Sequence, residues 1–176
     1  ISLLRMPDCW RIIVRVPEGL DEATVQEPAW YLPEVKRYLP LQGDHLPLIG
    51  QDVYGASKMV AARYREGRCF LIGDSAHLTN TRGGMNMNCG IHDAWAMAEA
   101  IADALAGGDW SGAERAADAR RAVAVESLIP RTDRNVAGGE AWLEEVAATA
   151  ADPARARAYL RGTAMLDIAP RVAAAA

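Results

Sequence analysis

One stretch of the sequence, residues 67–94, constrains the fold more than any other. It begins with a short apolar run, Cys69 to Ile72, which ends in Gly73 and Asp74. A loop rich in glycine and asparagine follows, and then a long segment with helical periodicity. In parallel sheets, ligands bind beyond the carboxyl ends of strands, and helix N-termini bind anionic or electron-rich groups. The order of strand, aspartate, glycine loop and helix therefore predicts half of a cofactor site.

The same stretch resembles the second flavin-binding motif of the FAD-dependent aromatic hydroxylases, the flavoprotein monooxygenases typified by para-hydroxybenzoate hydroxylase. The family pattern is Gly-Asp-Ala-Ala-His, a short proline-containing loop, Gly-Gly-x-Gly-Met-Asn, and then x-Gly-x-x-Asp-Ala. The matching segments here are Gly73-Asp74-Ser75-Ala76-His77, Gly83-Gly84-Met85-Asn86-Met87-Asn88 and Gly90-Ile91-His92-Asp93-Ala94. A composite pattern at matching spacing is far more specific than a lone glycine motif, although an ordinary strand, turn and helix is the simpler alternative.

The resemblance implies that this stretch binds FAD. The carboxylate of Asp74 would contact the ribityl chain, with a cap on the following turn as its alternative role. The helix N-terminus near residues 87–90 would face the N1–O2 region of the flavin, where negative charge builds on reduction. The predicted cofactor-binding residues are Gly73, Asp74, Gly83, Gly84, Met85, Asn86, Met87 and Asn88. Gly90 would also allow close approach of the backbone to the flavin ring, unless it serves only a tight turn.

The sequence departs from the family pattern at two places. Asn86 stands where the family has glycine, which is costly if the backbone there needs a positive φ, although asparagine tolerates that conformation better than most residues. Asn80 and Thr81 replace a Pro-Pro pair in a loop that borders flavin and substrate in relatives. We therefore predict that Asn80 and Thr81 contribute to substrate binding.

By resemblance, the function is that of an FAD-dependent monooxygenase that hydroxylates an aromatic or heteroaromatic ring. NAD(P)H would reduce FAD, and a flavin C4a-hydroperoxide would transfer the oxygen, so that the cofactor performs the oxidation. No catalytic residue can be named from the sequence. A flavin halogenase or reductase of the same superfamily is a weaker alternative, because the tryptophan-containing halogenase motif is not found.

The family also has an N-terminal βαβ unit with Gly-x-Gly-x-x-Gly, which binds the ADP half of FAD. That motif does not occur in the 176 residues. We expect the chain to be the C-terminal part of such an enzyme, completed by the missing half or associated as a homo-oligomer through exposed strand edges. The alternative is a non-catalytic fragment or interaction module that retains half a flavin site.

Composition excludes several other classes of function. The net charge of -4 is not that of a nucleic-acid-binding protein, and no apolar run is long enough to span a membrane. Three widely spaced cysteines suit reduced thiols in the cytoplasm better than a disulfide framework. Cys69 and Cys89 are interpreted as small apolar fillers.

The predicted fold class is α/β, or α+β for the fragment alone. We divide the chain into substrate-domain strands and loops (1–62), the second FAD-binding motif (63–108) and C-terminal helices (109–176). Strands are predicted at 1–5, 10–16 and 54–61, and a strand buried on both faces at 69–72. Helices are predicted at 35–39, at 111–128 with a Ser111–Glu114 capping box and a stop at Pro130, at 140–148, and at 153–167.

The helix after the glycine loop has an apolar stripe that predicts which side faces a core. The stripe consists of Ile91, Ala94, Trp95, Ala98, Ile101, Ala102 and Leu105. Among the histidines, His77 is interpreted as structural, with a direct chemical role as the alternative. His45 is assigned to a solvated loop, with a place in the aromatic pocket as its alternative, and His92 to a surface or loop contact. The three histidines lack the spacing of metal ligands. Arg131 and Arg134 are interpreted as a solvated helix end.

Overall fold

The computed structural model describes residues 1–39, 47–81, 83–137 and 139–168, and the chain forms two compact units, residues 1–55 and 56–176. Of residues 137, 139 and 140, only the backbone is described. His45 and the alanine-rich end therefore lie outside the described residues. Each unit is treated by itself below.

The first unit combines a hairpin with two helices. Strands β1 (Ser2–Arg5) and β2 (Trp10–Ile13) pair antiparallel, with Ser2 opposite Ile13. The first strand is confirmed, whereas the second ends three residues before the predicted limit. Helix α1 (Glu22–Gln26) is capped by Asp21, whose side chain accepts a hydrogen bond from the backbone N–H of Thr24.

Helix α2 (Pro28–Tyr38) is longer than the predicted helix at 35–39. Pro28 and Pro33 argue from the sequence against a longer helix here. Pro28, however, occupies the first turn of α2, where its missing N–H would have had no helical partner anyway. Tyr31 and Val35 are buried and, with Val25 of α1, are the buried apolar residues among those described in this unit.

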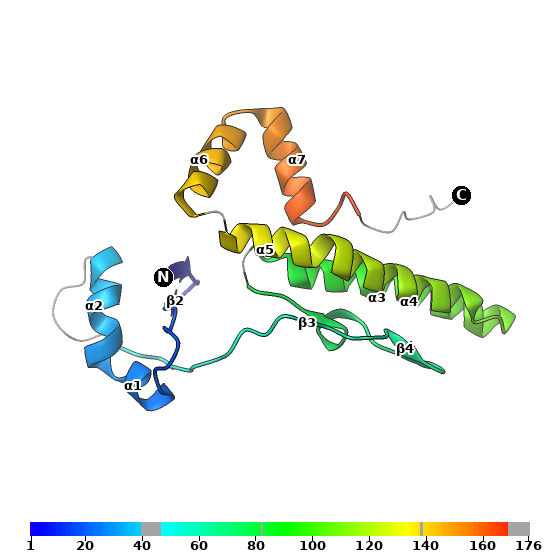
Figure 1. Ribbon diagram of the computed structural model, residues 1–176, viewed down its shortest axis with the longest axis horizontal. Helices are drawn as coiled ribbons and strands as arrows, with labels where there is room; N and C mark the ends of the chain where they lie inside the picture. The colour runs from blue at the N-terminus through cyan, green and yellow to red at the C-terminus, as the bar shows by residue number, and fades with distance from the viewer. Residues whose placement is uncertain (40–46, 82, 138, 169–176) are drawn as a thin grey trace. The chain divides into compact units, whose positions relative to one another are not determined.

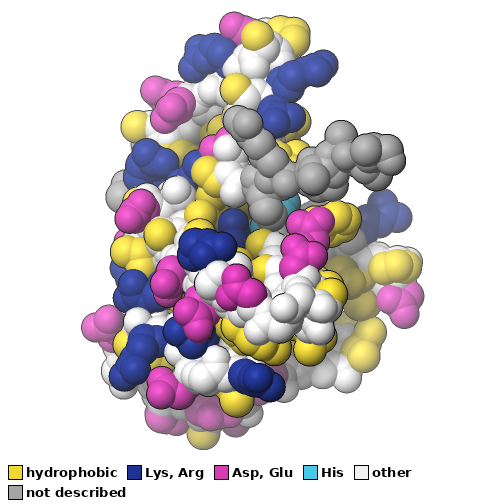
Figure 2. All heavy atoms as spheres, turned by 90° about the vertical axis from the view of Figure 1, so that its right-hand side faces the viewer, with side chains coloured by type: hydrophobic (Ala, Val, Ile, Leu, Met, Phe, Trp, Pro, Cys, Tyr) yellow, Lys and Arg dark blue, Asp and Glu magenta, His cyan; other side chains and the backbone are white. Residues whose placement is uncertain are grey.

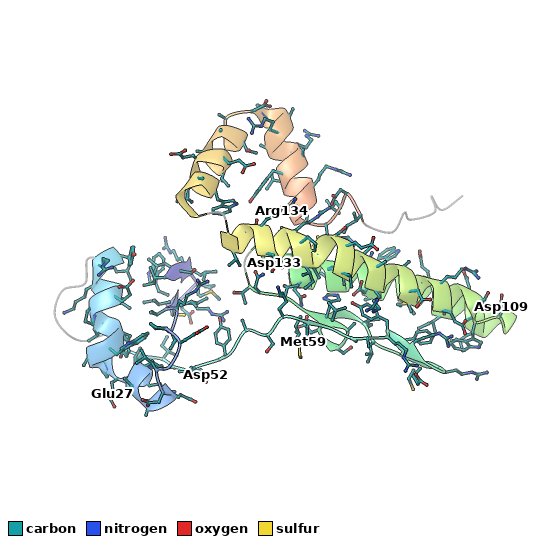
Figure 3. The ribbon with its side chains drawn as sticks, viewed as in Figure 1. Glu27, Asp52, Met59, Asp109, Asp133 and Arg134 are labelled. Atoms are coloured by element: carbon teal, nitrogen blue, oxygen red, sulfur yellow. The ribbon has the colours of Figure 1, made fainter. Side chains whose placement is uncertain are left out.

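The second unit is mainly helical (Figure 1). Helix α3 (Met85–Gly107) packs along α4 (Ser111–Val123), and Gly108 ends α3 with φ of 75°. Asp109, labelled in Figure 3, accepts hydrogen bonds from the backbone N–H and the hydroxyl of Ser111. The start of α4 is therefore held by Asp109, and the predicted capping box is wrong because Glu114 instead pairs with Arg65.

Pro130 was predicted to stop the helix, and this prediction is wrong: the helical path continues through it. A π-helical turn, η2 (Ala124–Leu128), connects α4 directly to α5 (Ile129–Ala137). Proline has no N–H to donate to the carbonyl four residues earlier, and a π turn is one way for a helix to continue past such a gap. The result is one long helical path across residues 111–137.

Two further helices, α6 (Gly139–Ala150) and α7 (Pro153–Thr163), confirm the predicted helical C-terminal half. Asp152 caps α7 as expected, accepting from the N–H groups of Ala154 and Arg155. The helix ends four residues before the predicted limit. Arg131 is not a solvated helix end: its guanidinium makes two hydrogen bonds to Asp167, at 2.6 and 2.9 Å, which tie α5 to the segment after α7.

The strands of the second unit are short antiparallel pairs. Strand β3 (Met59–Val60) pairs with β6 (His77–Leu78), and β4 (Arg65–Glu66) pairs with β5 (Cys69–Phe70) around Gly67. The strand predicted at 54–61 is reduced to two residues. Cys69, Leu71 and Ile72 are exposed, so the prediction of a strand buried on both faces and of Cys69 as a filler is wrong for this structure.

The core of the second unit lies between α3, α4 and the short strands. Its buried apolar members are Tyr64, Ala76, Met85, Cys89, Met97, Ala113, Ala117, Ala124, Leu128 and Met165. The predicted stripe of α3 is wrong in most of its members. Six members of the stripe are exposed and are called here the outer face of α3: Ile91, Ala94, Trp95, Ala98, Ala102 and Leu105. The seventh, Ile101, packs against the core.

Neither α3 nor any other described helix combines the length and apolarity needed to cross a bilayer. On the face shown in Figure 2, acidic and basic side chains are interspersed rather than gathered into a patch of one sign.

Candidate cofactor site

The turn after β5 presents Asp74 to solvent. Gly73 adopts φ of 57° and opens a single 3-10 turn, η1 (Gly73–Ser75). The hydroxyl of Ser75 accepts from the N–H of Ile72 and donates to its carbonyl, which closes the turn. Asp74 is exposed, and one of its carboxylate oxygens, Oδ1, accepts a hydrogen bond of 2.6 Å from Asn86 Nδ2.

The glycine loop supplies two backbone conformations that other residues rarely adopt. Gly83 has φ of 94° and Gly84, which precedes the first residue of α3, has φ of 61°. A Cβ at Gly83 would also meet the side-chain amide of Asn135 on α5, which would have to move to make room. Both glycines are therefore required for the tight entry into α3.

Helix α3 begins at Met85, two residues before the region in which the sequence placed its N-terminus. No side chain caps this end of the helix. The first backbone N–H groups are thus available to an electron-rich group. The Met85 side chain is buried in the core, which leaves only its backbone for a ligand, whereas 69% of Met87 is exposed.

Asn86 does not need a positive φ. It lies in the first turn of α3, and Met165 is the one non-glycine residue with positive φ among those described. The cost considered for asparagine at this position therefore does not arise. Instead, its side-chain amide contacts two of the motif's polar groups, Asp74 and His77.

Behind the site lies a buried triad of His77, Asp93 and Arg120. His77 Nε2 lies 2.7 Å from one oxygen of Asp93, and Arg120 Nε donates to the other at 2.6 Å. The N–H of Gly73 also donates to Asp93, at 3.3 Å. The triad therefore joins the turn η1, strand β6, helix α3 and helix α4 at one buried carboxylate.

The triad shifts the ionisation of its own members. Burial alone would lower the pKa of His77, but hydrogen bonds with Asp93, Cys89 and Asn86 outweigh it and raise the pKa to about 10. For Asp93, burial opposes the charge, whereas hydrogen bonds from His77 and Arg120 hold the pKa below its ordinary value of 3.8. At neutral pH the triad is thus a cationic histidine and an arginine around one carboxylate.

His77, Cys89 and Asp93 bring their donor atoms within 4.8 Å of one another, a grouping that the sequence spacing did not predict. Arg120 already occupies this position, because its guanidinium donates to Asp93 and lies 3.5 Å from the Cys89 sulfur. A divalent cation here would compete with a buried guanidinium for the same lone pairs, so the donor set fits an ionic network better than a metal site.

Gly83 and Asn88 line an open cleft of about 700 Å³ together with one side of α7. The residues from α7 include Ala156, Arg157, Leu160 and Arg161. Volumes of this order are typical of small-molecule sites. Two of the predicted cofactor-binding residues thus share a surface with the C-terminal helices, which the sequence analysis left without a function.

The two predicted substrate-binding residues differ in their surroundings. The amide of Asn80 donates to Asp133 on α5, at 3.1 Å, and Lys58 forms an ion pair with the same carboxylate (Asp133 is labelled in Figure 3). Thr81 is exposed beside it. Asn80 therefore anchors the loop to α5, and its contact with a substrate stays a prediction.

Sequence reasoning missed the parts that Asp93 and Arg120 play. Asp93 was quoted in the motif but given no role, and Arg120 lies on α4, far away in sequence. One signal was present: Met85, Cys89, Asp93 and Met97 follow one another at intervals of four. A charged residue in the middle of an apolar row of a helix indicates a buried, paired carboxylate.

The His92 side chain makes a hydrogen-bond contact within the second unit, since its Nε2 atom lies 3.3 Å from the carbonyl oxygen of Ala164.

Gly90 has a structural role in this chain. A Cβ there would lie 3.0 Å from the Cα of Gly73, so the absence of a side chain lets α3 pass close to the turn η1. The contact brings α3 next to the turn that contains Asp74.

Comparison with known proteins finds a match to the FAD binding domain family over residues 22–131. A para-nitrophenol 4-monooxygenase of Pseudomonas sp. (strain WBC-3) is 36% identical over 100 residues, which cover 52% of this chain and 23% of that protein. A 3-(3-hydroxy-phenyl)propionate/3-hydroxycinnamic acid hydroxylase of Mycobacterium avium (strain 104) is 31% identical over 140 residues, which cover 73% of this chain and 23% of that protein.

Among solved structures, a p-nitrophenol 4-monooxygenase from Pseudomonas putida DLL-E4 matches with a TM-score of 0.59 and 32% identity. The match covers 91% of this chain and 38% of that one. The chain thus spans about a quarter of the length of these relatives and less than half of the solved structure.

Proposed function

Because this chain belongs to the FAD-binding domain family, among FAD-dependent aromatic hydroxylases, we propose that it forms the part of such a monooxygenase that holds the flavin end of FAD. The complete enzyme would hydroxylate an aromatic or heteroaromatic ring, with NAD(P)H as reductant. The relatives' names concern nitrophenols and hydroxyphenyl acids, which suggests a small aromatic substrate.

The single observation that supports this proposal best is the convergence of Asp74 and the uncapped start of α3. Asn86 links the two directly, and the contact of Gly90 with Gly73 keeps them close. Asp74 offers an acceptor for hydroxyl groups, and the first N–H groups of α3 offer donors and a positive dipole end. A polyol chain attached to an electron-accepting ring fits that pair of features.

When bound, FAD would supply the redox chemistry, and this chain's residues would bind and orient it. Asp74 accepts hydrogen bonds from the ribityl hydroxyls. The N–H groups of residues 85–88 stabilise negative charge on the ring side that faces them. Gly73, Gly83 and Gly84 shape the turns, and the exposed Met87 and the cleft-lining Asn88 provide further contact surface. Asn80 and Thr81 would border the substrate.

The outer face of α3 supports the proposal of a partner for this chain. Ile91, Trp95 and Leu105 are 56, 51 and 71% exposed on one helix. Exposed apolar surface of this kind marks interaction sites. We infer that this face packs against the half of the flavoprotein that binds ADP. Without that half, copies of the chain would associate through the same face.

A cytoplasmic location stays a prediction from the three free cysteines.

The first test is a titration of the purified chain with FAD, followed by flavin fluorescence. Asp74→Asn keeps the shape of the side chain and removes its charge, so we expect binding about tenfold weaker. Asp103→Asn, at an exposed position of α3, is the matched control and should bind like the unchanged chain. Equal affinity of Asp74→Asn and the control would contradict the assigned role of Asp74.

The alternative is a non-catalytic module that retains half a flavin site. NADH consumption that depends on FAD and on an aromatic substrate, with the ADP-binding half supplied in trans, would establish the enzyme. A silent assay despite saturable FAD binding would favour the module.

A further inference from the structure

We propose that Asn86 is a positioning residue, which connects the buried triad to Asp74 and holds the Asp74 carboxylate in the orientation that receives the ribityl chain. The proposal rests on the proposed function, because it assigns to Asp74 the contact with FAD. It concerns a residue at which this sequence departs from the family pattern, so it describes this chain rather than the family.

The contacts form one continuous chain from the core to the surface. Arg120 holds Asp93, Asp93 accepts from His77 Nε2, His77 Nδ1 lies 2.9 Å from Asn86 Oδ1, and Asn86 Nδ2 donates to Asp74 at 2.6 Å. The first three groups are buried and the last is exposed. Asn86 is therefore the side chain that links the buried ionic cluster to the solvent-facing carboxylate of Asp74.

The donor and the acceptor of each hydrogen bond in this series of contacts follow from the chemistry of the groups. Asp93 already accepts from Arg120 and Gly73 and can only accept again, so Nε2 of His77 donates to it. With the second ring nitrogen also protonated, Nδ1 donates to the Asn86 oxygen. The amide nitrogen of Asn86 must then face Asp74.

The opposite orientation of the Asn86 amide is unfavourable at both ends. A flipped amide would place its NH₂ group against the Nδ1–H of His77 and its oxygen against the carboxylate of Asp74. Donor would face donor, and acceptor would face acceptor. The cationic His77 therefore fixes the amide, and the amide fixes Asp74 through Oδ1, which leaves Oδ2 for a ligand hydroxyl.

The test replaces the amide while keeping its shape. In Asn86→Asp, the new carboxylate can still accept from His77 but faces Asp74 as a second acceptor. We expect FAD binding about tenfold weaker at pH 7.5. At about pH 5 the two carboxyl groups can share a proton, which restores a donor between them, so the loss should shrink to about threefold or less.

A swapped variant separates positioning from folding. Asp74→Asn combined with Asn86→Asp restores a donor and an acceptor between positions 74 and 86 but moves the charge away from position 74. Without FAD, we expect the melting temperature to fall in Asn86→Asp and to recover in the swapped variant. FAD affinity should stay about tenfold weaker in the swapped variant, as in Asp74→Asn alone, because position 74 has lost its charge. The positioning role of Asn86 is read from the Asn86→Asp variant, whose loss of affinity should depend on pH, which a merely structural role would not produce.

The outcomes distinguish the two proposals. Failure of the unchanged chain to bind FAD would count against the proposed function, while the melting temperatures without FAD would still test the link between Asn86 and Asp74. An Asn86→Asp variant that binds FAD like the unchanged chain at both pH values would overturn the positioning role. Equal melting temperatures of all variants would overturn the link itself.

Discussion

At the scale of single residues, the buried triad decides how the candidate site is held. Asp93 receives hydrogen bonds from Gly73, His77 and Arg120, so one carboxylate fixes a turn, a strand and two helices. Leaving a buried charge without its partner costs about 3–5 kcal/mol. The geometry around Asp74 thus depends on buried residues that lie behind it.

This arrangement predicts how stability changes with pH. The pKa of His77 is raised from 6.5 to about 10 in the folded chain, so its contribution is fully present below pH 6.5 and is lost as the pH rises through about 10. We expect the free energy of unfolding in urea to fall over that range. For Asp93, whose pKa is lowered, the contribution is present above pH 3.8 and is lost as the pH falls below it.

The variant His77→Gln should remove most of the alkaline decline and destabilise the chain by about 3–5 kcal/mol at neutral pH. His92→Gln, which alters one hydrogen bond to the carbonyl of Ala164, is the matched control and should keep the decline. An unchanged pH profile in His77→Gln would mean that another group titrates.

At the scale of elements, α3 has two apolar faces. Met85, Cys89, Met97 and Ala104 face the core, while Ile91, Trp95 and Leu105 face outward. A helix that is apolar on both sides is typical of one covered on both sides. This property places α3 between the core seen here and a surface that another polypeptide segment would cover.

Matched substitutions on the two faces test this interpretation. Met97→Ala removes a side chain that is 2% exposed and should cost about 2–5 kcal/mol in urea unfolding. Leu105→Ala, at 71% exposed, should change stability by less than about 0.5 kcal/mol. Ile91→Glu should reduce self-association in sedimentation; a monodisperse monomer of the unchanged chain would instead contradict the idea that copies associate through this face.

At the scale of the whole molecule, the core and the candidate site belong to one unit. Every member of the core cluster, from Tyr64 to Met165, lies within residues 56–176. The described residues of the predicted cofactor site, from Gly73 to Asn88, lie there too. The first unit has its own small group of buried residues, Val25, Tyr31 and Val35.

We therefore expect residues 56–176 to fold when produced alone. We follow their thermal unfolding by near-ultraviolet circular dichroism. The melting temperature should lie within a few degrees of the main melting temperature of the full chain, because the larger core lies entirely within residues 56–176. FAD affinity should also be retained within about threefold of that of the full chain. Loss of the transition on removal of residues 1–55 would show that the first unit is needed for folding.

The sequence alone determined the local features of this protein. The spacing of Gly73, Asp74, Gly83 and Gly84 predicted a turn, a glycine loop and a helix, and the Asp152-Pro153 pair predicted the start of α7, because turns and caps depend on neighbouring residues. The family followed from the same motif. The cofactor contacts assigned to those residues stay predictions.

Only the tertiary structure decided which surfaces are buried. The buried side of α3 contains Asp93, to which the sequence analysis gave no role. A charge is costly to bury, and Arg120 is the long-range partner that offsets the cost. The stripe of Ile91, Trp95 and Leu105 has the better apolar pattern but is exposed among the described residues of the second unit. Periodicity reports that a helix face is apolar, whereas its partner depends on segments distant in the chain, and that information is present only in the folded arrangement.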